Sequence, residues 1–497
     1  MGIKNFYRHF KKKFGTCIVQ NCPVQHDILI LELNGIFYDC TKRYMLSKMI
    51  QKQKPQIKNL ELFEMIGDEI FFLIEKFLPK EKVFLAVDGF APLMKFREQF
   101  QRRQKNAICN FYDGLFDLNQ YTPGTKFMDF LTKYIDWIIK KKMNENVDRL
   151  KDIHIFFSNE KNRGEGEYKS IQFLLKQENE YKTICIYSND SDWIQLSLLL
   201  PLPKYEIYIC RNKYDKYEYI DINRYKNQLK EYFFDKNSMI SYIDMYILFL
   251  FLGNDYIESF NYLDTFDLIF EMVLPLYRNS KMHLIHTNSF QLDVKSYIDF
   301  IKLCFKQIPS FSNSSKKSIQ YQEYRNIYYY FYSIQNLVNM SLHSGTFDWN
   351  FVDFSKIDLS ILNFVDLDSF IQYQVNSKSI IEKESDPIDD CLFHLMILLP
   401  PESQHLLPKC LGHCPRMAYD KLLFDKTKNK FIFDFKLQHF SEMKLFYFKQ
   451  RENLSYEERK RNQEGKIFEY YFNDRKQTFL KSFYGMIKRN KIEVKCF

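Results

Sequence analysis

The stretch Gly-Glu-Gly-Glu-Tyr-Lys, residues 164–169, places two carboxylates two positions apart among small residues. An apolar run typical of a strand, Ile153–Phe157, precedes it, and the apolar spacing over residues 171–175 predicts a helix after it. Glu165 and Glu167 are therefore expected on the loop that leaves the carboxyl end of a strand, where α/β proteins bind ligands. The alternative is a solvated acidic loop at a helix start, where glutamates suit the helix dipole.

Other predicted strands also end in carboxylates. Apolar runs at residues 28–33, 83–87 and 183–187 predict buried strands that alternate with helices, which is the pattern of an α/β fold. The acidic residues at these strand ends are Glu32, Asp88, Asp190 and Asp192, and Asp255 follows a helical run at a Gly-Asn-Asp turn.

Together with Glu165 and Glu167 these residues make seven carboxylates that converge on one region of the predicted fold. Such a set would be strongly unfavourable unless cations neutralised it. Oxygen ligands favour Mg²⁺ or Mn²⁺ over zinc. We expect two such ions, because a pair about 3.5–4 Å apart can activate water and stabilise the leaving oxygen when a phosphodiester is hydrolysed.

A basic helix is predicted directly after the strand that ends near Asp88, with Pro92 at its start. Spacings of four and three place Lys95, Gln99 and either Arg102 or Arg103 on one face of that helix. A cation, an amide and a guanidinium on one face suit the binding of a phosphate group. The alternative is a solvated basic face, which is the commoner outcome for such helices.

The composition is that of an ordinary globular protein, with 46% hydrophobic and 27% charged residues in a chain of 497. That length predicts more than one domain. The balance of 71 basic against 62 acidic residues gives a net charge of +9, a modest preference for polyanions. The basic amino terminus lacks the apolar core of a signal peptide, and the most apolar run, Met245–Leu252, is too short to span a bilayer.

The 11 cysteines are scattered without paired spacing, which predicts reduced thiols in an intracellular protein, with the cytoplasm as the expected compartment. The tight spacing of His405, Cys410, His413 and Cys414 suggests a zinc site. Because no second pair of the CxxC type accompanies this cluster, structural zinc is the less favoured interpretation.

These motifs resemble those of the XRN-type 5′→3′ exoribonucleases, in the same order along the chain. The similar segments are LELNGIFYDCT (31–41), VDGFAPLMKFREQFQRR (87–103), FDLNQYTPGTKFM (116–128), GEGEYK (164–169), YSNDSDWI (187–194) and FLGNDY (251–256). A weaker similarity, LMILLPPESQHLLPKC at 395–410, falls in the second half. The resemblance covers most of the chain.

The resemblance implies a PIN/flap-nuclease-like α/β core with a mixed, mainly parallel sheet flanked by helices. It implies a nuclease core over residues 1–260 and a mostly helical second region, 261–497, that wraps this core. The implied metal ligands are Glu32, Asp88, Glu165, Glu167, Asp190, Asp192 and Asp255. The implied 5′-phosphate pocket consists of Lys95, Gln99, Arg102 and Arg103.

This chain departs from the family at three points. Glu32 replaces an aspartate, and its extra methylene could shift a bound metal ion. Tyr38 replaces the histidine on which the first base stacks, and a tyrosine can still stack. A loose alignment places Asn336 where the family has the tryptophan on the other face of that base, so half of the stacking pair would be missing. The chain is also short, without room for long carboxyl-terminal modules.

The sequence therefore predicts a 5′→3′ exoribonuclease that hydrolyses single-stranded RNA with a 5′-monophosphate to 5′-mononucleotides, by two-metal-ion catalysis. A flap or DNA-directed nuclease of the same superfamily is one alternative. A catalytically decayed RNA-binding scaffold is another, supported only by Glu32 and Asn336.

Overall fold

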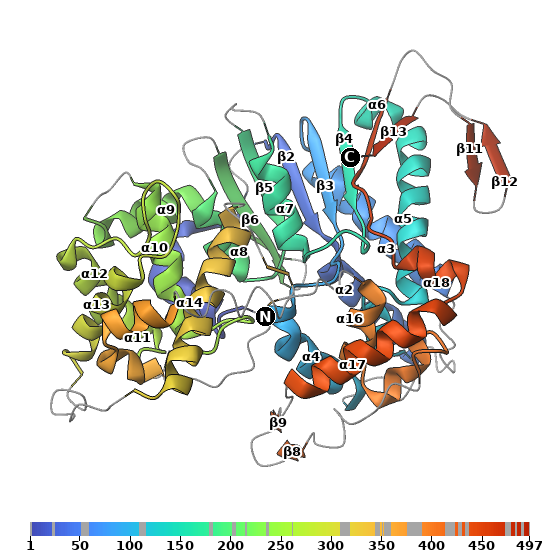
Figure 1. Ribbon diagram of the computed structural model, residues 1–497. Helices are drawn as coiled ribbons and strands as arrows, with labels where there is room; N and C mark the ends of the chain where they lie inside the picture. Colours follow the sequence, from blue (N-terminus) through green and yellow to red (C-terminus); the bar gives the residue numbers. More distant parts are fainter. Residues whose placement is uncertain are drawn as a thin grey trace.

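The computed structural model describes residues 2–21, 25–50, 59–108, 116–177, 182–200, 205–213, 216–234, 238–260, 262–308, 319–342, 348–349, 351, 359–374, 390–412, 423–425, 430–432, 437–472, 479–482, 485–488 and 492–496. A central twisted sheet separates a helical lobe on one side from a second group of helices on the other (Figure 1). Within the described ranges, no helix is both long and apolar enough to cross a membrane.

The described residues form a central sheet of nine strands. Their order is β1 (Ile18–Val19), β7 (Lys216–Asp221), β6 (Tyr205–Lys213), β5 (Lys182–Tyr187), β2 (Ile28–Glu32), β3 (Lys82–Ala86), β4 (His154–Ser158), β10 (Phe468–Phe472) and β13 (Ile492–Cys496). The five strands from β6 to β4 are parallel to their neighbours, whereas the strands beyond them pair antiparallel. The prediction of a mixed sheet with a parallel centre, flanked by helices, is confirmed.

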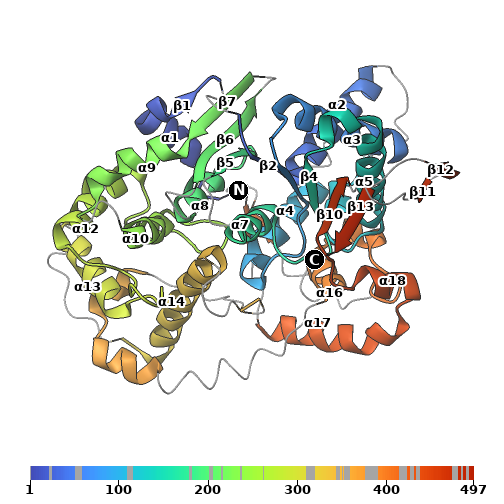
Figure 2. The ribbon, with the colours of Figure 1, turned by 90° about the horizontal axis from the view of Figure 1, so that it is seen from above.

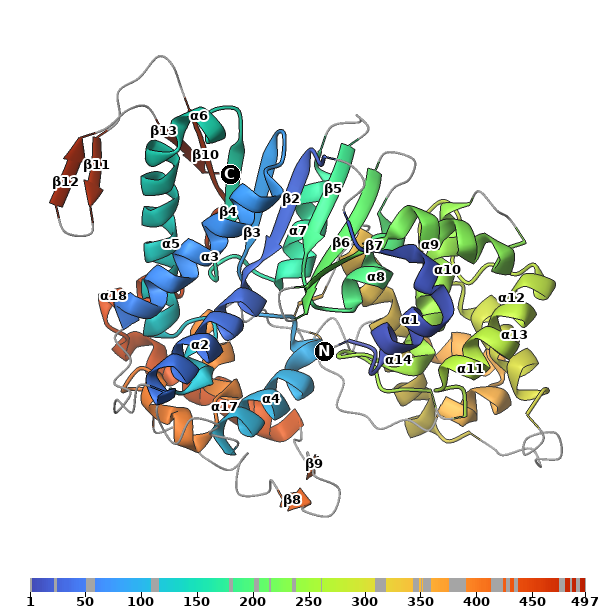
Figure 3. The same cartoon turned by 180° about the vertical axis from the view of Figure 1, so that it is seen from behind.

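Alternating apolar side chains of the central strands bury both faces of the sheet. In β2, Ile28 and Ile30 belong to one core, and Leu29 and Leu31 belong to the other. The first core includes residues of α7 (Gly166–Leu175). This helix lies in front of the sheet in Figure 1. Helices α2 (Leu33–Ile50), α3 (Asn59–Phe77) and α5 (Lys126–Glu145) cover the opposite face, which is seen from behind in Figure 3.

The helical lobe beside β6 continues the core under α7. It contains α1 (Phe6–Phe14), α9 (Ile222–Leu229), α10 (Met239–Phe249), α12 (Leu274–Ser280), α13 (Val294–Phe305) and α14 (Tyr321–Leu342) (Figure 2). One apolar cluster runs from the strands into this lobe and includes residues on both sides of position 260. The division at residues 260/261 stays a prediction.

The carboxyl-terminal part of the chain returns to the amino-terminal half. Helix α16 (Cys391–Leu398) shares a small apolar core with α4 (Phe96–Ile108) and α17 (Leu437–Gln450), and α18 (Tyr456–Arg461) follows nearby. Strand β10 then pairs with β4, and Tyr470 lies fully buried on it. In the suggested zinc cluster, His413 and Cys414 lie outside the described residues.

Strand β10 covers the edge of the parallel sheet, and unpaired sheet edges promote association between chains. A chain that ends at Gly465 lacks β10 and β13, so we expect its Tm to fall by about 5 °C or more, with aggregation near that temperature. Calorimetry and light scattering measure both effects. A chain that ends at Phe472 keeps β10 and is the control; identical melting of the two shortened chains would contradict this role of β10.

Candidate active site

The predicted acidic residues lie at the carboxyl ends of neighbouring parallel strands. Glu32 is the last residue of β2, and Asp88 follows β3. Glu165 precedes α7 and Glu167 lies in its first turn, directly after the loop from β4. Because β2, β3 and β4 are parallel neighbours, their ends meet at one edge of the sheet.

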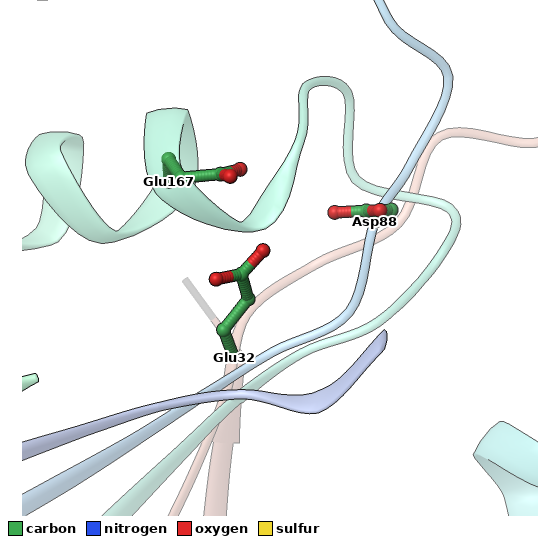
Figure 4. Close-up of side chains that lie close together, drawn as sticks. All are labelled: Glu32, Asp88 and Glu167. Carbon is green, nitrogen blue, oxygen red and sulfur yellow. The ribbon is translucent and has the colours of Figure 1, made fainter. Parts of the chain in front are cut away.

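Three of these carboxylates face one another. One carboxylate oxygen from each of Glu32, Asp88 and Glu167 lies within 4.8 Å of the other two, as Figure 4 illustrates. Gly166 makes this approach possible, since a Cβ there would lie 3.0 Å from Cγ of Glu32. The backbone N–H of Gly166 also donates a hydrogen bond of 2.8 Å to Oδ1 of Asp88.

Burial and mutual repulsion work against ionisation of this trio. Burial, followed by the charges of Asp190 and Asp88, raises the pKa of Glu32 to about 7. Burial, followed by the charge of Glu32, raises the pKa of Glu167 well above its usual range. A cation among these oxygens would favour the ionised forms. The all-oxygen donor set of Glu32, Asp88 and Glu167 fits a hard divalent ion such as Mg²⁺ or Mn²⁺.

Two further predicted ligands, Glu165 and Asp255, form ion pairs with Lys95. Nζ of Lys95 is 2.6 Å from Oε2 of Glu165 and 2.9 Å from Oδ2 of Asp255, and all three side chains are almost completely buried. Burial raises the pKa of Glu165, but Lys95 more than offsets this and brings it below its usual range. The same lysine lowers the pKa of Asp255 to about 2 in spite of burial. Tyr256 adds a hydrogen bond of 3.0 Å from its hydroxyl to Glu165.

Asp190 and Asp192 complete the predicted set. Asp190 follows β5, and its backbone N–H donates to Oγ of Ser188 at 3.0 Å. Asp192 begins α8 (Asp192–Leu196). A Cβ on Gly2 would collide with the carboxylate of Asp192, so the start of the chain packs directly on this residue. Burial, and then the charge of Asp190, raises the pKa of Asp192 well above its usual range.

The predicted phosphate-binding residues differ in their surroundings. Nε2 of Gln99 lies 3.5 Å from Oε1 of Glu165, so Gln99 reaches the same carboxylate as Lys95. Arg102 pairs with Glu98 at 2.7 Å and lines the cavity described below. Arg103 is buried, does not line that cavity, and donates from Nε to Oγ1 of Thr122 at 3.2 Å. Of the two arginines, Arg102 is the one that faces the acidic residues.

Several of the acidic and basic residues share a cavity with a volume of about 720 Å³, which includes open solvent at its mouth. Glu32, Asp88, Glu165, Glu167 and Asp190 line it, together with Lys95, Arg102 and Tyr38. The Tyr38 ring lies edge-on to Tyr121, with centroids 5.3 Å apart. Asn336 does not line this cavity and is only 2% exposed in α14, so the suggested stacking position there stays a prediction.

Sequence reasoning missed the residues that hold the carboxylates in place. Ser188 and Trp193 both donate hydrogen bonds to Oε2 of Glu32, the second from Nε1 at 3.3 Å. The ammonium of Lys169 donates to the carbonyl oxygens of Val87 and Asn159, each at 2.7 Å, and so ties α7 to the ends of β3 and β4. Ser188, Trp193 and Lys169 all lie within the motif segments already quoted, but their partners are distant in sequence.

The comparisons with known proteins agree with these motifs. A family model described as "XRN 5'-3' exonuclease N-terminus" matches residues 1–112 and 104–213. A protein named 5′-3′ exoribonuclease 1 from Schizosaccharomyces pombe is 31% identical over 220 residues, which cover 40% of this chain and 16% of that protein. The protein of the same name from Saccharomyces cerevisiae is 27% identical over 336 residues, covering 58% and 21%.

The chain therefore spans roughly a fifth of the length of these relatives. A solved structure described as the catalytic core of Rad2 in complex with DNA substrate matches with a TM-score of 0.34 and 12% identity, over 75% of this chain and 98% of that one. A TM-score of 0.34 is too low for this match to support a conclusion about fold or function. The first 213 residues are thus similar to the amino-terminal part of the XRN-type 5′→3′ exonucleases, and the relatives reported above are named 5′-3′ exoribonucleases.

Proposed function

We propose that this protein is a 5′→3′ exoribonuclease that hydrolyses 5′-monophosphorylated RNA to 5′-mononucleotides. One observation carries the proposal: a single cavity contains both the carboxylate trio and the cationic side chains Lys95 and Arg102. Carboxylates of this kind suit metal-assisted hydrolysis, and the cations suit a terminal phosphate. The relatives named 5′-3′ exoribonucleases support RNA as the substrate.

Glu32, Asp88 and Glu167 would hold a divalent cation. Glu165, Asp190 and Asp192 line the adjoining space, and Asp255 shares Lys95 with Glu165, so these four are the candidate ligands of a second ion. Mg²⁺ or Mn²⁺, when bound, supplies the positive charge that activates water and stabilises the leaving oxygen of a phosphodiester. Other residues of the chain orient these carboxylates. Ser188 and Trp193 hold Glu32, while the N–H of Gly166 holds Asp88.

The cationic side chains would select the 5′ end. Arg102 offers a planar set of N–H donors that matches a phosphate, and Lys95 adds a point charge. Both share one cavity with the trio, so a phosphate bound there lies about one nucleotide from the reacting bond. This spacing releases single nucleotides. A triphosphate brings additional charge, and a cap brings a whole additional nucleotide, into a pocket with few donors.

Removal of the Arg102 side chain tests the selection of the 5′ end. Loss of a desolvated charge contact costs about 2–5 kcal/mol, so we expect Arg102→Ala to slow the decay of monophosphorylated RNA by tens of fold. The slow decay of 5′-hydroxyl RNA should hardly change. Time courses on otherwise identical RNAs with 5′-monophosphate, 5′-triphosphate and 5′-hydroxyl ends, with Mg²⁺ present, measure this selectivity.

Arg97 provides the matched control, because it lies on the same helix, pairs with Glu258 and does not line the cavity. Arg97→Ala should keep the preference for the monophosphate. Similar decay of all three RNAs by the wild-type protein, or cleavage within the strand, would refute an exonuclease that recognises the 5′ phosphate.

Two substitutions separate the effect of side-chain length at Glu32 on hydrolysis from the effect of its charge. We expect Glu32→Asp to retain or improve hydrolysis, since it keeps the carboxylate, and Glu32→Gln to lose at least about tenfold, since it removes the charge. Hydrolysis rates over a series of Mg²⁺ concentrations measure both effects. Glu64→Gln, at an exposed position on α3, is the control. Equal rates in all forms would assign Glu32 a structural role only.

The raised pKa of Glu32 predicts a dependence of stability on pH. With a pKa of about 7 against an ordinary value of 4.5, the folded protein keeps a proton that the unfolded chain releases. The free energy of unfolding therefore falls as pH rises from about 4.5 to 7. In thermal melts with EDTA present, the Tm of the wild-type protein should fall over this pH window. The Tm of Glu32→Gln should fall less. Addition of Mg²⁺ at pH 7.5 should raise the Tm of the wild-type protein again. A Tm that rises over the window in EDTA would contradict the raised pKa.

A further inference from the structure

The loop between β4 and α7, residues 159–165, leads to Glu167 in the first turn of α7. The same loop is tied to the segment that follows β3, because the backbone N–H of Gly89 donates a hydrogen bond of 2.9 Å to the carbonyl oxygen of Gly164. Gly89 comes directly after Asp88 in the chain. The position of the β4–α7 loop is therefore linked to the positions of two carboxylates of the trio.

The segment between α18 and β10 packs against this loop from the carboxyl-terminal part of the chain. The backbone N–H of Gly465 donates a hydrogen bond of 3.1 Å to the carbonyl oxygen of Lys161. Strand β10 then pairs with β4, and the two strands lie side by side in Figure 2. Glu464 adds an ion pair with Arg163 at 3.6 Å, but Glu464 is exposed and such pairs contribute little.

The space at Gly465 is too small for a side chain. A Cβ there would lie 2.7 Å from Cβ of Lys161, 2.8 Å from Oδ1 of Asn159 and 2.9 Å from the backbone nitrogen of Asn162. Separations below 3.0 Å are essentially never observed for a Cβ, so any side chain at this position must displace the loop. Gly465 does not have a positive φ, so the requirement for glycine here is steric.

Asn162 connects this contact to the metal site. Its backbone nitrogen lies against Gly465, and its carbonyl oxygen lies so close to Gly89 that a Cβ there would overlap it. Protein interiors are close-packed and transmit such displacements. A group at residue 465 that moves Asn162 therefore changes the contact of Asn162 with Gly89, the neighbour of Asp88.

We propose that Gly465 is a positioning residue of the metal site, which keeps Asp88 and Glu167 where a divalent cation can bind both. The inference rests on the proposed function, because it assumes that these carboxylates bind the cation. Gly465 does not line the cavity that contains them and acts through the β4–α7 loop. With a larger residue at position 465, the cation has to restore the displaced loop as it binds, and its affinity falls accordingly.

Gly465→Ala tests this role by the addition of one methyl group. Overpacking is unfavourable, so we expect Mn²⁺ to bind about five- to tenfold more weakly than to the wild-type protein. Titration of the full chain, followed by the electron paramagnetic resonance of free Mn²⁺, measures the affinity. Gly412→Ala is the matched control, because a Cβ at Gly412 would come no closer than 3.5 Å to the surrounding atoms. It should bind Mn²⁺ as the wild type does.

The dependence of hydrolysis on Mg²⁺ separates positioning from a general effect on stability. In Gly465→Ala, the Mg²⁺ concentration that gives half of the maximal rate should rise about five- to tenfold, while the maximal rate stays within about twofold of the wild-type rate. A purely structural role would lower the Tm and leave the dependence on Mg²⁺ unchanged. That result would overturn the proposal.

A measurement on the wild-type protein decides even if Gly465→Ala does not fold. Coupling between two sites is reciprocal, so a bound cation must strengthen the contact between Gly465 and Lys161. Hydrogen exchange over residues 463–467, measured by mass spectrometry without RNA, should therefore slow about fivefold when Mg²⁺ is added. Exchange around Gly412 should not change. Unchanged exchange over residues 463–467, at Mg²⁺ concentrations that support hydrolysis, would also overturn the proposal.

The Mn²⁺ titration distinguishes this failure from failure of the proposed function, with Glu32→Gln as a third protein. If only the role of Gly465 is wrong, Gly465→Ala binds Mn²⁺ as tightly as the wild type, and Glu32→Gln still binds it more weakly. If the carboxylates do not bind a cation, Glu32→Gln also binds Mn²⁺ as the wild type does, and the proposal fails together with the proposed function.

Discussion

Repulsion between partly buried carboxylates is the constraint on which the rest of the site depends. Glu32, Asp88 and Glu167 approach within 4.8 Å, and each has a pKa raised by burial and by its acidic neighbours. A fold keeps such an arrangement only where its packing enforces it. The parallel order of β2, β3 and β4 brings the strand ends together, and the absence of a side chain at Gly166 lets α7 approach them.

The neighbouring cations partly offset this repulsion and at the same time divide the acidic set. Lys95 compensates Glu165 and Asp255, whereas Lys169 donates to two backbone carbonyls and contacts no carboxylate of the trio directly. The trio consequently lacks a directly bonded cation among the described residues, and a divalent cation that binds there would favour its ionised forms. The oxygen donors of the trio suit a divalent cation, and the adjacent Arg102 attracts a phosphate. Both groups line one cavity, which supports the proposed removal of terminal nucleotides.

Local sequence patterns predicted which carboxylates stand at the strand ends. They did not predict the contacts between segments that are distant in sequence. The apolar runs that end at Glu32, Asp88 and Asp190 have the length and composition of buried strands, and parallel strands bring such ends to one edge. Pairing across long sequence distances has no such signature. The segment Phe468–Phe472 gave no indication that it would extend the sheet beyond β4, and the contact of Lys95 with Asp255 depends on how α4 packs. Helical spacing alone did not distinguish Arg102 from Arg103, because packing determines the rotation of a helix.

The central claim is that the carboxylate trio is a metal site. Anomalous diffraction from a crystal soaked in Mn²⁺ measures this most directly, because manganese scatters anomalously and the light atoms of the protein hardly do. The account predicts a strong peak among the oxygens of Glu32, Asp88 and Glu167, and its loss in crystals of Glu32→Gln soaked in the same way. A map without a peak among these three residues, at a Mn²⁺ concentration that supports hydrolysis in solution, would contradict it.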